Sequence, residues 1–218
     1  MRERAWAIFR DLPDPLYETI KHEAGRGRFE VGEAVFHRGD AADDLHLVMH
    51  GHFAVEYTGS SGKTVVMTIL GPGDTFGEVA LLEPGAKRSA TVVALEQSRT
   101  RVIDRDWLAS LRDKHPSVDR LLIAVLTAQV RRLTETTFEV RITPRQRIRR
   151  RLCALARSYD GGEIPITTEV LADIAGTSRA RVSELIREEK KAGTLASRRG
   201  RISVLDLPRL EERAAPEG

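Results

Sequence analysis

The 218-residue chain contains one cysteine, Cys153, and aromatic residues make up only 5% of it. A single cysteine cannot form an internal disulfide, and it excludes a four-cysteine zinc or iron–sulfur site within one chain. No window approaches about 18 uninterrupted apolar residues, so no membrane span is predicted. The first six residues carry charges with no apolar segment behind them. We therefore expect no secretory signal and a cytoplasmic protein.

The composition is that of a globular protein, with 41% hydrophobic and 31% charged residues. This apolar content excludes general disorder, and the length fits one large domain or two small ones. Residues 141–218 contain 17 basic and 11 acidic side chains, and the first 140 residues contain the remaining 18 of 35 basic and 21 of 32 acidic ones. A basic C-terminal third is predicted to face a polyanion. The alternative is chance clustering of charge on solvated faces.

Residues 27–105 are typical of β structure. Short apolar runs such as Leu45–Val48 and the β-branched Thr64–Leu70 alternate with turn signals such as Gly39-Asp40 and Gly71–Asp74. Many short strands with regular Gly and Asp punctuation predict a small antiparallel barrel or roll.

Residues 116–140 predict one long helix, because apolar residues recur at spacings of three and four and no Gly or Pro follows Pro116. A helix of about 23 residues is roughly 35 Å long, which exceeds what a small β domain can cover. We therefore expect an equivalent helix of a second chain to cover its apolar stripe, giving a homodimer; the alternative is packing within one chain. The stripe comprises Val118, Leu121, Leu122, Val125, Leu126, Val130 and Leu133.

A helical region follows a hinge at Arg141–Thr143. Thr143-Pro144 offers a hydroxyl cap and a proline at the first helical position, so a helix is predicted over 145–158. Two shorter helices, at about 168–175 and 178–191, joined by a turn at Gly176, form a helix-turn-helix pattern. A two-stranded hairpin with a basic tip is predicted beyond Gly193. The expected domains are therefore a sensor (1–115), a long helix (116–140) and a third domain (141–218).

The first chemistry-bearing group contains Gly77, Glu78, Arg88 and Ser89. Gly77 lets the backbone approach a ligand, and the amides of the turn that follows it are available to an anion. The Glu78 carboxylate can accept from sugar hydroxyls, while Arg88 and Ser89 can donate to a phosphate. This set suits a sugar phosphate, although an Arg–Glu pair taken alone is more often a salt bridge.

The second group lies in the helix-turn-helix. Leu171, Val182, Leu185 and Ile186 are expected on its buried side, with Ala172 small where the helices cross. The residues predicted on or near the outer face at the start of the second helix, where a recognition helix meets the major groove, are Thr177, Ser178, Arg179, Arg181, Ser183 and Glu184. Arg179 is the best candidate for a bidentate contact to guanine. Phosphate contacts are predicted at Thr167, Thr168, Arg199 and Arg201.

From about Phe29 to Leu210 the sequence resembles the cyclic-AMP receptor family of bacterial transcription regulators, within the wider group that includes fumarate–nitrate regulators. The likeness is carried by Phe29–Glu33, Phe36–Asp40, Leu45–Gly51, Gly77-Glu78 and Arg88–Ala90. It implies an α+β fold: an N-terminal cyclic-nucleotide-binding β-roll, a long dimerisation helix and a C-terminal winged helix-turn-helix that binds double-stranded DNA at palindromic sites. It also implies RNA polymerase as a partner if the protein is an activator.

The resemblance also implies roles in a cyclic-nucleotide site. Glu78 takes the ribose 2′-hydroxyl, Arg88 and Ser89 hold the cyclic phosphate, and the backbone of Gly77, Val79 and Ala80 assists. Thr136 and Thr137 stand where the family's adenine-contacting hydroxyls stand, and the alternative is that both are solvated helix residues. The effector expected is cAMP.

Two departures from the family's activator affect these expectations. The chain is about four residues shorter after Thr137, roughly one helical turn, which changes the hinge. Ala180 and Glu184 replace an acidic residue and a second Arg. Because Glu cannot donate to guanine, we predict a different DNA half-site.

Alternatives concern the effector and the class of protein. cGMP, a cyclic di-nucleotide, haem or ligand-independent binding stay open; for haem, His37, His46, His50 and His52 are expected to be surface or strand residues. A cyclic-nucleotide-regulated enzyme finds no support, since no P-loop, kinase motif set, nucleophile elbow or His–Glu metal spacing occurs. We expect no catalytic residue and no metal site.

Overall fold

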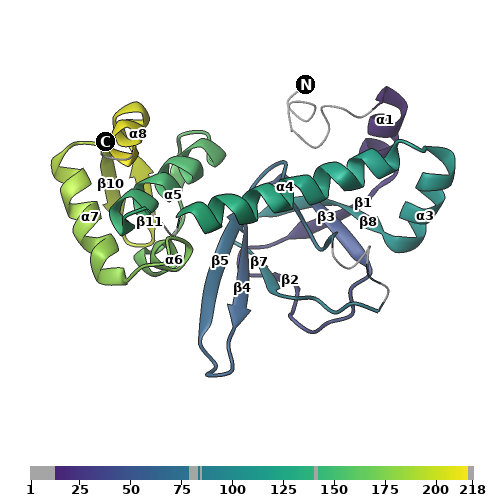
Figure 1. Cartoon of the computed structure of the whole chain (residues 1–218), viewed down its shortest axis with the longest axis horizontal. Coiled ribbons are helices and arrows are strands. Elements are labelled where there is room, and N and C mark those ends of the chain that lie inside the picture. The colour runs from purple at the N-terminus through teal and green to yellow at the C-terminus, as the bar shows by residue number, and fades with distance from the viewer. Residues whose placement is uncertain (1–12, 79–82, 84, 140–141, 216–218) are drawn as a thin grey trace. The chain divides into compact units, whose positions relative to one another are not determined.

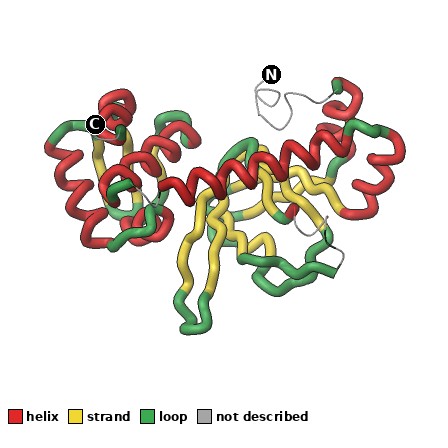
Figure 2. The backbone as a smooth tube through the Cα atoms, viewed as in Figure 1, coloured by secondary structure: helices red, strands yellow, loops and turns green. Residues whose placement is uncertain are grey.

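The computed structural model describes residues 13–78, 83, 85–139 and 142–215, without the side chains of 135–139. The chain divides into two compact units: an N-terminal unit of residues up to Thr64 with Thr68–Leu133, and a C-terminal unit of Val65–Met67 with Thr134–Gly218. Along the chain, most strands precede one long helix and a mainly helical region follows it; Figure 2 shows the strands in yellow and the helices in red. The succession of strands, long helix and helical region is the one predicted.

Strands β1–β8 form two four-stranded sheets, ordered β1-β8-β3-β6 and β2-β7-β4-β5 (Figure 1). The pairs recorded between their strands are antiparallel, which confirms the predicted antiparallel roll. The elements are α1 (Asp14–Glu23), β1 (Gly25–Phe29), β2 (Ala34–Phe36), β3 (Asp44–His50), β4 (Phe53–Thr58), β5 (Thr64–Leu70), β6 (Thr75–Phe76), β7 (Thr91–Ala94), β8 (Ser98–Asp104), α3 (Arg105–Lys114) and α4 (Val118–Glu139).

One apolar core joins residues of the two sheets. Its buried members are Val48, Phe53, Leu70, Phe76, Val92 and Ala94. Gly51 makes the tight turn between β3 and β4 with φ +78°, where an added Cβ would collide with Ser98. Side chains alternate along a strand, so one face of each sheet supplies this core.

A second core lies between the β1-β8-β3 sheet and the helices. Leu45, Leu47 and Ile103 of the strands pack with Leu121 and Val125 of α4. Helices α1 and α3 complete this core; neither was predicted. The Asp104 carboxylate caps α3 by accepting from the Trp107 backbone N–H at 2.8 Å.

Helix α4 carries two apolar stripes rather than one. Val118, Leu121, Leu122 and Val125 are buried in the second core. Ile123, Leu126, Val130 and Leu133 remain 41–67% exposed, at spacings of three, four and three, which is the pattern of a coiled-coil seam. The predicted stripe therefore combined a face used within the chain with a face open to solvent.

The C-terminal unit is a helical domain with a small sheet ordered β10-β11-β9. Thr143 caps α5 as predicted, and with Gln146 it forms a capping box. No described helix is long and apolar enough to cross a membrane. The elements are α5 (Pro144–Ser158), β9 (Glu163–Ile164), α6 (Thr168–Ile174), α7 (Arg179–Lys191), β10 (Leu195–Arg198), β11 (Arg201–Val204) and α8 (Leu207–Ala214); β9 and α8 were not predicted.

Candidate functional site

Gly77 and Arg88 lie in direct contact in the N-terminal unit. Gly77 has φ +87°, and an added Cβ would lie 2.6 Å from Arg88 Nη1 and 2.7 Å from the Asp44 backbone oxygen. A side chain is thus excluded twice, by the backbone conformation and by the guanidinium. Gly77 was predicted to let the backbone approach a ligand, which stays a prediction; the structure shows that it also leaves room for Arg88.

Arg88 is buried and is held by two residues, Asp44 and Phe36. Its Nη1 donates to the Asp44 backbone oxygen at 2.8 Å, and its Nη2 donates to Asp44 Oδ1 at 2.5 Å. Its guanidinium carbon lies 4.0 Å from the centre of the Phe36 ring. The third donor, Nε, is buried and has no hydrogen-bond partner among the described residues.

Glu78 is buried beside the start of a helical turn. Its Oε1 accepts from Gln129 Nε2 of α4, whereas its Oε2 is buried and finds no partner in the described part of the chain. Glu78 and Arg88 therefore each keep one buried atom, an acceptor and a donor, without a partner among the described residues. Buried polar atoms are nearly always paired, so such a combination indicates a site that a ligand completes.

Asp44 links Arg88 to a buried histidine. Its Oδ1 lies 3.1 Å from His46 Nε2, and the His46 ring stacks on Phe76 with centroids 4.9 Å apart. Burial acts to raise the pKa of Asp44, but hydrogen bonds and charge from His46 and Arg88 outweigh it and lower the pKa. Asp44 is therefore ionised and balances Arg88. Its long-range contact with Arg88 has no local sequence signal and was not predicted.

The structure describes only some of the other residues predicted to bind the ligand. Ser89 is exposed. Val79 and Ala80 lie outside the described residues, and Thr136 and Thr137 lie on α4 with side chains that are not described. Their roles stay predictions.

The helix-turn-helix is formed as expected by α6 and α7. Leu171, Ala172, Val182, Leu185 and Ile186 are buried, with exposed fractions of at most 6%. Gly176 takes φ +57° in the turn. Arg147 of α5 also holds this turn, donating to the carbonyls of Ala175 and Gly176 at 2.8 and 3.0 Å; the sequence analysis did not identify this contact.

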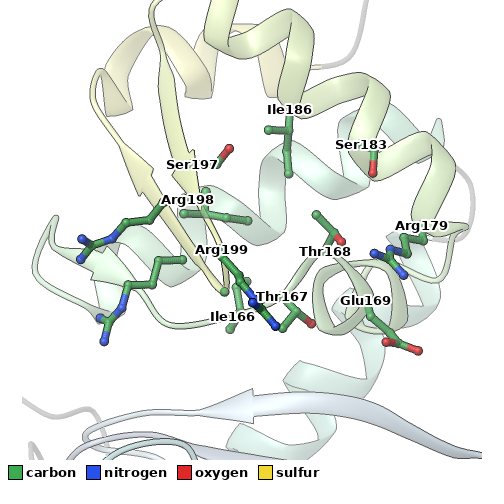
Figure 3. A pocket seen from close by; sticks show the side chains of 13 residues that line it. Ile166, Thr167, Thr168, Glu169, Arg179, Ser183, Ile186, Ser197, Arg198 and Arg199 are labelled. Atoms are coloured by element: carbon green, nitrogen blue, oxygen red, sulfur yellow. The ribbon is translucent and has the colours of Figure 1, made fainter.

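A cleft of about 440 Å³ lies between the start of α6, the start of α7 and the β10–β11 hairpin. Six predicted DNA-contacting residues line it: Thr167, Thr168, Arg179, Ser183, Arg199 and Arg201. Arg179 and Arg199 approach from opposite sides with Thr168 between them, while Arg198 points away (Figure 3). Arg198 and Arg201 both bond to Glu163 of β9, at 2.5 and 3.4 Å, which steadies the hairpin.

The remaining predicted DNA contacts do not line this cleft. Ser178 caps α7 by accepting from the Arg181 backbone N–H at 3.4 Å, and Thr167 caps α6 in the same way. A capping hydroxyl keeps its own O–H for another acceptor. Arg181 and Glu184 are exposed, with Glu184 3.7 Å from Arg145. The Thr177 hydroxyl oxygen is buried and has no partner among the described residues, so this hydroxyl is less accessible to DNA than predicted.

A buried ionic network fixes the far end of α7. Glu189 is fully buried and accepts from Arg149 Nη2 of α5 at 2.7 Å, Arg213 Nε of α8 at 3.0 Å and Thr194 Oγ1 at 2.7 Å. Burial acts to raise the pKa of Glu189, but bonds from Arg213, Thr194 and Arg149 outweigh it and lower the pKa. The network anchors α7 to α5 and α8 at one end and leaves Arg179 exposed at the other.

The histidines considered for haem binding and the single cysteine have other surroundings than those chemistries need. His52 is buried and not in a strand, which corrects the expectation of a surface or strand residue, and its Nδ1 lies 2.6 Å from Glu96. His46 is a strand residue but is also buried. Burial and the Glu211 charge raise the pKa of the Cys153 thiol to about 11, so Cys153 is not a reactive thiolate.

Comparison with known proteins agrees with this layout. A family model described as Cyclic nucleotide-binding domain matches residues 26–115, and one described as Crp-like helix-turn-helix domain matches residues 146–213. A CRP-like cAMP-activated global transcriptional regulator of Mycobacterium tuberculosis is 27% identical over 215 residues, covering 95% of this chain and 96% of its own. A solved CRP-family transcriptional regulator of Thermus thermophilus has 25% identity and a TM-score of 0.72, covering 86% of this chain and 96% of its own.

The relationship is stronger for another protein of Thermus thermophilus. Its Cyclic AMP receptor protein is 34% identical over 192 residues, which cover 86% of this chain and 87% of the relative. This relative and the two matched family models together show that the chain belongs to the cyclic AMP receptor protein (CRP) family of transcription regulators.

Proposed function

We propose that this protein is a homodimeric regulator that binds palindromic DNA sites when a cyclic nucleotide, cAMP, occupies its N-terminal unit. The observation that supports a cyclic nucleotide as effector is that two buried atoms, Glu78 Oε2 and Arg88 Nε, have no partner among the described residues. An unpaired buried polar group costs about 1–3 kcal/mol, and more when it is charged. A ribose hydroxyl that donates to Glu78 and a phosphate oxygen that accepts from Arg88 would remove both costs.

The roles within the site follow from donor and acceptor chemistry. Arg88 and Ser89 hold the cyclic phosphate, the backbone at Gly77, Val79 and Ala80 assists, and Glu78 takes the 2′-hydroxyl. Thr136 and Thr137 meet the exocyclic amine of adenine. The relatives from Thermus thermophilus and Mycobacterium tuberculosis are named for cAMP, which supports cAMP over cGMP.

The exposed seam of α4 supports the dimer. Ile123, Leu126, Val130 and Leu133 repeat at heptad spacing and stay 41–67% exposed. A partner α4 would bury them, at about 25 cal/mol per Å² of apolar surface removed from water. A dimer also gives the two recognition helices that a palindrome needs, at half-sites about 34 Å apart.

The cleft beside α7 supports the DNA contacts. Arg179 donates to guanine, with Ser183, Thr177, Ser178, Arg181 and Glu184 near the same groove. Thr167, Thr168, Arg199 and Arg201 hold phosphates, which position the helix without reading sequence. Because the Glu184 carboxylate cannot donate to guanine, the preferred half-site differs from that of the cAMP-dependent activator. RNA polymerase is a partner if the regulator activates transcription.

Gating requires that cAMP bind two arrangements of the dimer with different affinity. A ligand shifts an equilibrium only by its differential affinity for the two states. Gln129 of α4 bonds to Glu78, so a ligand that engages Glu78 acts on a residue already tied to the dimerisation helix. We infer that this bond couples the site to α4.

Titration calorimetry with cAMP, cGMP and a cyclic di-nucleotide, combined with gel shifts on a palindromic duplex, tests the proposal. We expect cAMP to bind most tightly and to increase DNA affinity. Arg88→Ala should lose cAMP binding, whereas Arg179→Ala should keep it and lose sequence preference. Arg187→Ala, an exposed arginine of α7 outside the cleft, is the matched control and should preserve both.

No affinity for cAMP at millimolar concentration would remove the effector from the proposal. Tighter binding of cGMP or of a cyclic di-nucleotide would replace cAMP. Unchanged DNA affinity with and without any nucleotide would make the protein ligand-independent. A haem absorption band in the purified protein would indicate a different input, although His46 and His52 are buried and hydrogen-bonded.

A further inference from the structure

A second basic cleft, of about 330 Å³, lies on the N-terminal unit and shares no lining residue with the Glu78–Arg88 site. Its lining includes Arg26 and Arg28 of β1, Arg99 and Arg101 of β8, and Met49 and His50 of β3. None of the described residues that line it is acidic. Neither the cyclic nucleotide nor the DNA contacts proposed above use these arginines.

The register of the sheet explains why four arginines gather here. Arg26 stands opposite Arg101, and Arg28 stands opposite Arg99. Side chains two residues apart on a strand share a face, so all four arginines extend from one face of two adjacent strands. The intervening Thr100 belongs to the other face, where its Oγ1 lies 3.0 Å from Nδ1 of buried His46.

This arrangement is unfavourable without an anion. Like charges directly opposite each other destabilise a strand pair, and Arg28 stands directly opposite Arg99. In the described part of the chain, no carboxylate forms a salt bridge with Arg26, Arg28 or Arg99. The cluster also stands out against its surroundings, since the first 140 residues contain 18 basic and 21 acidic side chains.

We propose that this cleft binds an oligophosphate, an anion with two or more linked phosphate groups such as the chain of a nucleoside triphosphate. Arginine presents a planar fork of donors that matches phosphate oxygens. The two arginine pairs are two residues apart on antiparallel strands, hence about 6.8 Å. A chain of linked phosphates meets both pairs, whereas a single phosphate meets one.

The shape of the site favours this ligand over a macromolecule. The cleft is concave, has a volume in the range of small-molecule sites, and is built on three paired strands. A DNA backbone is held by a basic face that extends along the duplex, but here four arginines gather in one cleft, within a region whose acidic side chains outnumber its basic ones. Bound anion would also raise the melting temperature, because it binds the folded state.

Calorimetry on the full chain with inorganic tripolyphosphate tests the site directly. We expect tripolyphosphate to bind at least about tenfold more tightly than orthophosphate. Arg28→Ala and Arg99→Ala should each weaken it about tenfold or more, the size expected for one charged hydrogen bond. A parallel titration with a nucleoside triphosphate shows whether a base adds affinity to the phosphate chain.

The matched control is Arg199→Ala, which removes an arginine from the other basic cleft and should leave tripolyphosphate binding unchanged, as should saturating cAMP. Without ligand, Arg99→Ala should melt at the same temperature as the parent or higher, because it removes a repelling neighbour. The proposal is overturned if Arg99→Ala binds tripolyphosphate normally, if it melts several degrees lower, if Arg199→Ala abolishes binding, or if Arg99→Ala weakens only duplex DNA.

Discussion

Replacing Glu189 with Gln tests how the recognition helix is held. The carboxylate is fully buried and accepts from two arginines and a threonine. Gln has nearly the same shape but no charge, so two guanidinium groups lose their counterion. Removing one partner of a buried ion pair costs about 3–5 kcal/mol. Since the Arg213 side chain is 37% exposed and partly screened, we expect a cost near the lower end, about 3 kcal/mol.

Hydrogen exchange of the full chain measures this cost in the C-terminal unit alone. Amides that exchange only when the unit opens report its free energy of unfolding, and about 3 kcal/mol corresponds to roughly a hundredfold faster exchange. We expect this acceleration in peptides from α7 and β10 of Glu189→Gln. Peptides from β3 and β4, which belong to the other unit, should be unchanged.

Glu188→Gln is the matched control, one residue away on the same helix. Glu188 forms an ion pair with Arg145 while about a third of its side chain is exposed, and exposed pairs contribute about 0–1 kcal/mol. Exchange in Glu188→Gln should therefore accelerate fivefold at most. Equal acceleration in the two variants would refute the view that the buried network, rather than general helix charge, anchors α7.

Three further predictions concern the ligand turn, the dimer and pH. Gly77→Ala should destabilise the protein by about 1–3 kcal/mol and weaken cAMP binding, because the added Cβ would collide with Arg88 and Asp44. Gly85 has a similar φ but open space around it, so calorimetry should find that Gly85→Ala retains its affinity for cAMP. Ile123→Asp should convert the dimer to a monomer in light scattering, while the exposed Val31→Asp should not. The lowered pKa of Glu189 contributes stability that is complete above the pKa of the unfolded state, about 4.3, and is lost as pH falls through the lower pKa of the folded state. Thermal melts should show this loss of stability in the parent and not in Glu189→Gln; an equal loss in both would argue against a role of Glu189 in the pH dependence.

Local signals predicted the helical elements with strong caps. Thr143-Pro144 and Ser178 mark helix starts through their hydroxyls and, for α5, a proline, and both are confirmed. The helix α3 was missed although Asp104 caps it, because its two buried residues, Leu108 and Leu111, are too few to give a visible period. The two-residue β9 has no pattern of its own and depends on pairing with β11.

Contacts between residues far apart in the chain could not be predicted from the sequence. Asp44 precedes Arg88 by 44 residues, and Glu189 meets Arg149 across 40 residues. No periodicity or spacing relates such pairs, since only the folded chain brings them together. The same limit explains the single predicted stripe on α4: spacing identifies apolar positions, but only packing separates Leu121 from Ile123.

Buried charges in this protein fall into two kinds, and the difference separates framework from function. Glu189 has every acceptor position engaged by a named donor, which suits a residue whose task is to hold α7 still. Glu78 and Arg88 are also buried, each 7% exposed, yet each keeps an atom without a partner among the described residues. An unpaired buried atom lowers the stability of the ligand-free protein. A bound ligand that pairs with the atom would remove this loss of stability. The unsatisfied atoms of Glu78 and Arg88 are therefore a better guide to a ligand than the satisfied carboxylate of Glu189.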